Sequence, residues 1–243
     1  MLLKKIISLL SLIVFTFWTF FMAGLGVLQN LIFNRRKFDN WIITTWGSVA
    51  CGFFNVDVQV IGLEKLIPKQ GAILIFNHSS FIDILAMHGF INNIRFGAKI
   101  ELFKIPIFAQ AMKRFGTLPI ARNNREEVFK VYEEARIRFA RGEKFALSPE
   151  GGRFYGEQLS RFKSGPFVFA INAQVPLIPV VINGAYECWP KDSVLPNATR
   201  ISRKITIHIL DPVSTIGITV SDRSSLQDLC YEKMNAVYQK NTK

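Results

Sequence analysis

The 243-residue chain is long enough to form one large domain, or two small ones, around a sizeable hydrophobic core. Hydrophobic residues make up 49% of it, and its formal net charge at pH 7 is +12. This combination of apolar and basic residues is typical of two classes of protein. One is a nucleic-acid binder with a large core, and the other is a protein that sits on anionic lipid.

The N-terminal segment favours the lipid surface. No charged residue occurs between Lys5 and Arg35, which exceeds the roughly 20 residues that a helix needs to span a bilayer. A secretory signal has a shorter apolar core and a small-residue cleavage site, so we expect an uncleaved anchor. A second apolar run at residues 41–54 is short for a span and fits a re-entrant or interfacial helix. We therefore assign residues 1–54 to N-terminal membrane-anchoring helices and residues 55–243 to one α/β domain.

From residue 56 onward, short strand patterns alternate with helical patterns. The expected strands are residues 56–62, 71–76, 94–98, 144–148, 175–182 and 205–210. The expected helices are residues 84–90, short helices within 99–117, an amphipathic helix over 125–141, residues 165–173 and a C-terminal helix from residue 224. Two prolines in the strand at 175–182 favour a place near a loop or a sheet edge. This order predicts an α/β fold with a mixed, largely parallel sheet flanked by helices.

A polar segment, NHSSFID at residues 77–83, directly follows the apolar strand at 71–76. Histidine titrates near neutral pH, and a carboxylate can fix its tautomer and stabilise the imidazolium. His78 and Asp83 are about 140° apart on a helix, so contact between them requires a turn and a helix that begins near Ser79 or Ser80. The alternative is that Asp83 only caps this helix, because Ser80-x-x-Asp83 fits a capping pattern.

Three further polar stretches follow apolar segments, where α/β proteins gather their functional residues. They are FGTLPIAR at residues 115–122, SPEGGR at 148–153 and FKSG at 162–165. Glycines let backbone amides approach a ligand, and a helix N-terminus favours anions. Arg122, Arg153 and Lys163 together would suit a phosphate group. For any one stretch alone, a Gly–Pro turn that carries ordinary surface cations is the favoured interpretation.

Taken together in this order, these stretches resemble the motifs of the glycerolipid acyltransferase family. The family's first block, Asn-His-x-x-x-x-Asp, is matched by Asn77, His78 and Asp83. Its other blocks are matched by KIELFKIP at residues 99–106, Gly116 with Arg122, PEGGR at 149–153, FKSG at 162–165 and VPLIPV at 175–180. Gly152 departs from the pattern, because the family has a threonine there.

The resemblance implies a glycerolipid acyltransferase fold and an acyltransferase catalytic domain over residues 55–243. It implies transfer of a fatty acyl chain from an acyl-CoA or acyl-ACP thioester to the free hydroxyl of 1-acyl-glycerol-3-phosphate, which gives phosphatidic acid. His78 would be the general base and Asp83 its orienting partner. The acceptor would bind Arg122, Glu150, Gly151 and Arg153, with Lys163 a weaker candidate. We expect no metal and no cofactor beyond the acyl-CoA or acyl-ACP co-substrate.

Two alternatives stay open: an acceptor that is another lysophospholipid or lysolipid, and a non-catalytic protein that binds lipid. No nucleic-acid partner is expected, because the N-terminal run is apolar and no recognisable nucleic-acid motif occurs. Three widely spaced cysteines match no disulfide framework, and thioester donors are soluble. We therefore expect a catalytic domain that faces the cytoplasm from the inner membrane. Acyl-chain length, donor type, topology of residues 1–54 and oligomeric state stay open.

Overall fold

A computed structural model describes residues 2–32, 36–121, 123–197 and 203–242. Its strands are β1 (Val56–Ile61), β2 (Ala72–Phe76), β3 (Ile94–Lys99), β4 (Leu118–Ile120), β5 (Lys144–Leu147), β6 (Leu177–Asn183) and β7 (Arg203–Ile209). Its α-helices are α1 (Leu2–Ile32), α2 (Arg36–Phe53), α3 (Ile82–Phe90), α4 (Phe108–Arg114), α5 (Arg125–Arg136), α6 (Gly165–Ala173), α7 (Ala185–Cys188) and α8 (Arg223–Thr242). The seven strands of the described residues form one sheet in the order β1-β7-β6-β2-β5-β3-β4.

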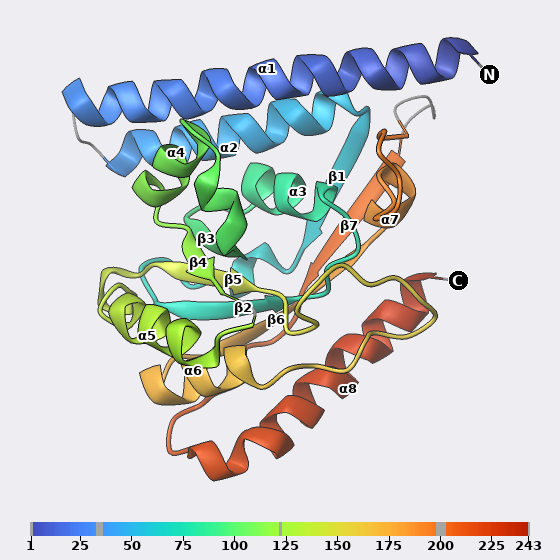
Figure 1. Cartoon of the computed structure of the whole chain (residues 1–243). Helices are drawn as coiled ribbons and strands as arrows, with labels where there is room; N and C mark the ends of the chain where they lie inside the picture. The colour runs from blue at the N-terminus through green and yellow to red at the C-terminus, as the bar shows by residue number, and fades with distance from the viewer. Residues whose placement is uncertain (1, 33–35, 122, 198–202, 243) are drawn as a thin grey trace.

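The sheet is the middle layer of the molecule. Helices α1 to α4 cover one face, and α5, α6 and α8 cover the other (Figure 1). Among the described strands, β6 and β7 are antiparallel to each other, and every other pair of neighbouring strands is parallel. The predicted mixed, largely parallel α/β architecture is therefore confirmed.

Every strand expected from the sequence is present, with ends that differ by at most two residues. The helix expected over 125–141 is α-helical only to Arg136 and ends in a separate 3-10 turn, Phe139–Arg141. Both β4 and α7 were missed, because three and four residues are too few to show a period.

The prolines at 175–182 were expected near a loop or a sheet edge. Pro176 does lie in the loop before β6, but the edge alternative is wrong, because β6 lies inside the sheet between β2 and β7. The β6–β7 ladder covers only Val180 to Asn183. Pro179 lies just before it and uses only its carbonyl oxygen there, which accepts a bond of 2.9 Å from the backbone N–H of Leu210. A residue without an N–H is therefore accommodated in an interior strand.

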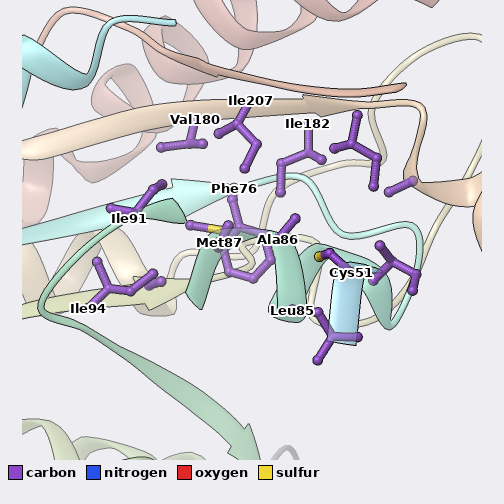
Figure 2. Packing of buried hydrophobic residues seen from close by; sticks show 14 of the residues in the cluster. Cys51, Phe76, Leu85, Ala86, Met87, Ile91, Ile94, Val180, Ile182 and Ile207 are labelled. Atoms are coloured by element: carbon purple, nitrogen blue, oxygen red, sulfur yellow. The ribbon is translucent and has the colours of Figure 1, made fainter. Parts of the chain in front are cut away.

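Strand β2 divides the hydrophobic core into two clusters, since all of its residues are buried. Leu74 and Phe76 face the cluster beneath α3, whereas Ile73 and Ile75 pack with residues of α5, α6 and α8. Figure 2 shows the first cluster, in which Phe76 lies between side chains of α3 and of strands β6 and β7. Burial on both faces explains why this strand is a continuous apolar run rather than an alternating one.

Helix α1 lies along the domain rather than projecting away from it (Figure 1). Ser8, Phe15 and Met22 are buried at intervals of seven residues, while large apolar side chains elsewhere on the helix are exposed. The segment Lys5–Gln29 is long and apolar enough to cross a membrane by length and composition. Phe15 and Phe54 belong to the same buried cluster as the sheet, so the N-terminal helices complete the core of the domain.

Helices α2 and α3 meet through two glycines. A Cβ atom at Gly47 would lie 2.5 Å from the carbonyl oxygen of Leu85, and one at Gly89 would lie 2.6 Å from the backbone nitrogen of Ser48. The two backbones therefore approach each other without intervening side chains. Because α3 follows the 77–83 segment directly, this contact fixes that segment relative to α2.

We expect Gly47→Ala to lower the free energy of unfolding by about 1–3 kcal/mol, because the added methyl group forces α2 and α3 apart. Gly52→Ala is the matched control on the same helix, since nothing lies within 4 Å of a Cβ there. It should leave stability unchanged or raise it by up to about 1 kcal/mol. Urea unfolding of the detergent-solubilised variants measures both effects, and equal stabilities would contradict the close contact.

Candidate active site

His78 lies just past the end of β2, at the carboxyl edge of the sheet. Its Nδ1 atom is 2.9 Å from Oδ2 of Asp83, which belongs to the first turn of α3. The Asp83 side chain is 0% exposed and that of His78 is 15% exposed. When Nδ1 donates to the carboxylate, Nε2 is left as the acceptor of the ring. The structure thus brings together the two residues that the sequence paired.

The same Asp83 oxygen also fixes the turn between His78 and Asp83. Oδ2 accepts hydrogen bonds of 2.8 Å from the backbone N–H groups of Ser79 and Ser80. Ser80 Oγ accepts from the N–H of Ile82 and donates to the carbonyl oxygen of Trp189. Asp83 therefore bonds both to the backbone of Ser80, as the capping alternative requires, and to the ring of His78, so the two alternatives occur together. Helix α3 begins at Ile82, two or three residues after the start at Ser79 or Ser80 that this contact was expected to require, because the preceding residues form this turn.

Asn77 holds the start of the same turn against β6. Its Nδ2 donates to the carbonyl oxygen of Ile182 at 2.8 Å, and its Oδ1 accepts from the N–H of Ile182 at 2.7 Å. The β2–β6 ladder ends at Phe76, so the Asn77 amide extends the strand pairing by one residue. The sequence placed Asn77 in the motif but did not indicate this partner.

Glu150 supports His78 from the neighbouring loop. Its Oε2 accepts from the backbone N–H of His78 at 2.8 Å, and its Oε1 accepts from that of Ser160 at 3.1 Å. Burial raises the pKa of Glu150 to about 7, the charge of Asp83 acts in the same direction, and the two N–H bonds oppose it. The predicted role of Glu150 in acceptor binding stays a prediction. In the structure its carboxylate ties two backbone segments together.

Gly151 and Lys163 lie against each other beside this loop. Gly151 has a φ of +74°, and a Cβ there would lie 2.7 Å from Nζ of Lys163, so the position requires glycine. The N–H of Lys163 donates to the carbonyl oxygen of Pro149 at 2.7 Å. Arg153 is half-buried and makes no recorded hydrogen bond or ion pair with another described residue. Arg122 lies outside the described residues.

A cavity of about 540 Å³ opens beside these groups, within the usual size of a small-molecule site. His78, Gly151 and Lys163 line it, together with largely apolar side chains of α1, α2, α3, α4, β3 and α5. Glu150 and Arg153 are not among the described residues that line it. Within the described part of the chain, no three His, Cys, Asp or Glu side chains lie close enough to hold a metal ion.

Helix α8 holds the loop that leads to Lys163, which the sequence did not indicate. Side chains at four positions on α8 hydrogen-bond to the backbone of residues 156–162. They are Gln227 Nε2 to Phe162 O at 2.9 Å, Tyr231 OH to Leu159 O at 3.0 Å, Leu159 N to Asn235 Oδ1 at 3.1 Å and Tyr238 OH to Gly156 O at 3.0 Å. The only available signal was a hydrogen-bonding side chain at every third or fourth position of the helix, from Gln227 to Tyr238.

Comparison with known proteins places this chain in one class of enzyme, those that transfer acyl groups. The profile of the Acyltransferase family matches residues 57–183, a segment that holds all seven predicted site residues, from His78 to Lys163. The chain belongs to the Acyltransferase family.

Curated relatives are found in several organisms. A putative 1-acyl-sn-glycerol-3-phosphate acyltransferase of Caenorhabditis elegans, acl-2, is 31% identical over 79% of this chain and 68% of its own length. The chloroplastic 1-acyl-sn-glycerol-3-phosphate acyltransferase BAT2 of Brassica napus is 30% identical over 67% of this chain. The match spans about half of BAT2, 48% of its length.

A solved structure has the same fold. The 1-acyl-sn-glycerophosphate acyltransferase PlsC of Thermotoga maritima superposes with a TM-score of 0.83 and covers 98% of this chain and 96% of its own. At 23% sequence identity, this likeness establishes the fold alone.

Glu150 predicts a pH-dependent contribution to stability. Its folded-state pKa of about 7 lies above the ordinary value of 4.5, so the folded protein binds this proton more tightly than the unfolded chain does. The free energy of unfolding should therefore fall as pH rises from about 4.5 to about 7, by on the order of 3 kcal/mol from this group, and then level off.

Urea unfolding of the wild type and Glu150→Gln between pH 5 and pH 9 isolates this contribution. The wild-type free energy of unfolding minus that of Glu150→Gln should decrease with rising pH and become flat above about pH 8, because half of the Glu150 carboxyl groups are still protonated at pH 7. A difference that does not change with pH would contradict the raised pKa.

Proposed function

We propose that this protein is a membrane-bound O-acyltransferase that makes phosphatidic acid. It would move a fatty acyl chain from an acyl-CoA or acyl-ACP thioester to the free hydroxyl of 1-acyl-glycerol-3-phosphate. The observation that carries the proposal is the His78–Asp83 pair at the wall of an apolar cavity of about 540 Å³. The acceptor named for the relatives from C. elegans and B. napus supports the same substrate.

The proposed chemistry is direct transfer assisted by a general base. The acceptor hydroxyl is a poor nucleophile until its proton is removed. Nε2 of His78 takes this proton while the hydroxyl oxygen bonds to the thioester carbonyl carbon, and the Asp83 carboxylate stabilises the imidazolium. The carbon–sulfur bond then breaks, and the leaving thiolate takes the proton from His78. The cycle therefore needs no covalent acyl-enzyme intermediate.

Lys163 is the cation best placed to bind the acceptor phosphate. It lines the same cavity as His78, and its side chain lies across Gly151, where the absence of a Cβ makes room for it. Arg122 and Arg153 complete the proposed phosphate site, with Glu150 and Gly151 as the remaining acceptor residues. Charge-assisted hydrogen bonds to phosphate are stronger than neutral ones, which favours a phosphate-bearing acceptor.

The N-terminal helices would hold the site at the membrane. Their exposed apolar side chains would contact lipid, and the net charge of +12 would attract anionic head groups. Met22 of α1 and Ile43 of α2 also line the cavity, so an acyl chain could pass from the bilayer into it without crossing water. We place the catalytic domain on the cytoplasmic side of the inner membrane, where soluble thioester donors reach it.

Purified, detergent-solubilised protein should acylate lysophosphatidic acid from acyl-CoA or acyl-ACP. His78→Ala should lower the rate by about 10²–10⁴-fold, because the hydroxyl loses its base. His208→Gln is the matched control, since His208 is a half-buried residue of β7 that does not line the cavity. Retained activity in His78→Ala would contradict the mechanism. A wild type that acylates only other lysolipids would move the proposal to another acceptor.

Lys163→Ala should raise the KM for lysophosphatidic acid about tenfold or more, because a charge-assisted bond to phosphate is lost. The same change should leave the KM for a monoacylglycerol acceptor, which lacks phosphate, unchanged. Lys191→Ala removes an exposed lysine that does not line the cavity and serves as the control. Equal effects of Lys163→Ala on both acceptors would contradict a phosphate contact.

A further inference from the structure

One side of the cavity carries polar groups although most of its wall is apolar. His88 of α3 lines the cavity between two aromatic rings, with centroids 5.9 Å away for Trp46 of α2 and 4.5 Å away for Phe96 of β3. Thr19 of α1 also lines it, and its Oγ1 accepts a hydrogen bond of 3.0 Å from Nε1 of Trp46. Helices α1, α2 and α3 thus meet at a polar group of side chains, which we term the Thr19–Trp46–His88 cluster.

His88 is the unusual member of this cluster, because its Nδ1 atom is buried without a hydrogen-bond partner among the described residues. Burial, with the charge of Arg95 in the same direction, lowers the pKa of His88 to about 3. The ring is therefore neutral at physiological pH, with one nitrogen as a donor and the other as an acceptor. Nδ1 is enclosed and is not reached from the cavity. His88 as a whole is only half-buried, and its other nitrogen, Nε2, is not enclosed and makes no hydrogen bond with a described residue, so Nε2 is free to pair with a polar group that enters the cavity.

The cluster lies away from the catalytic residues. Phe76 and Phe96 stand between the two histidines, with ring centroids 5.7 Å apart for Phe76 and His78, and 5.5 Å apart for Phe76 and Phe96. A ligand whose reacting carbonyl is beside His78 would therefore meet His88 with a more distant part of its chain.

We propose that the Thr19–Trp46–His88 cluster is a binding subsite for a hydroxyl group carried on the acyl chain away from its thioester. A hydroxyl can donate to Nε2 of His88 or accept from it, according to the tautomer of the ring, and it can also bond to Thr19 Oγ1. An unsubstituted chain leaves the imidazole unpaired against methylene groups, and sites built around a substrate hydroxyl reject analogues that lack it. Hydroxylated acyl thioesters would then be the preferred donors. This inference rests on the proposed function, because it takes the cavity as the place of the acyl chain.

Binding is tested with two non-hydrolysable thioether analogues of acyl-CoA of equal chain length, one unsubstituted and one with a hydroxyl at mid-chain. Calorimetric titration of the full-length protein in detergent should show tighter binding of the hydroxylated analogue, by roughly 3- to 10-fold. His88→Phe keeps an aromatic ring between Trp46 and Phe96 and removes both nitrogens, so it should abolish this preference by weakening only the hydroxylated analogue.

Met112→Leu is the matched control, because Met112 lines the same cavity and carries no hydrogen-bonding group comparable to an imidazole. It should keep the wild-type ratio of affinities. Thr19→Val provides a second variant if His88→Phe fails to fold, and it should lower the ratio in the same direction. Equal affinities in the wild type, or an unchanged ratio in His88→Phe, would overturn the subsite.

Turnover separates this inference from the proposed function. Wild-type protein that acylates lysophosphatidic acid equally well from hydroxylated and unsubstituted donors would overturn the subsite and leave the function standing. A calorimetric preference without turnover from either donor would support the subsite and overturn the function.

Discussion

The active-site geometry depends on one buried oxygen, Oδ2 of Asp83. It accepts three hydrogen bonds, at 2.9 Å from Nδ1 of His78 and at 2.8 Å from the N–H groups of Ser79 and Ser80. Three donors offset the cost of burying a carboxylate, and they set the turn and the imidazole orientation together. Glu150 holds the backbone of His78 from the opposite side. The ring is therefore positioned by contacts from two separate segments, as a general base requires.

In the proposed function, the N-terminal helices would connect this site to the membrane. They contribute to the same hydrophobic cluster as the sheet, line the cavity that reaches His78 and expose apolar side chains on their outer face. The close contact of Gly47 with Gly89 joins α2 to α3, whose first turn carries Asp83. The N-terminal helices, the cavity and the His78–Asp83 pair are thus parts of one packed unit, so displacement of these helices would alter the site.

The features that could be predicted from the sequence are those that depend on residues close together in the chain. The apolar run of β2 and the motif after it were enough to expect a buried strand and a His78–Asp83 contact. Patterns of burial do not identify which strands become neighbours, so the interior place of β6 and the contact of Glu150 with the His78 backbone were missed. The pairing of β6 with β2 joins Ile73 to Leu177, and the Glu150 contact joins residues 72 apart, so both depend on segments that are distant in the sequence. The α8 contacts with residues 156–162 were missed for the same reason.

The central claim is that Asp83 acts through the ring of His78. A double-mutant cycle tests this directly, with rates of acyl transfer measured for His78→Ala, Asp83→Asn and the double variant. If Asp83 serves only to orient and stabilise the imidazole, the double variant should be no slower than His78→Ala. If Asp83→Asn slows the reaction by the same factor whether or not the histidine is present, Asp83 acts independently of His78 and the account is contradicted.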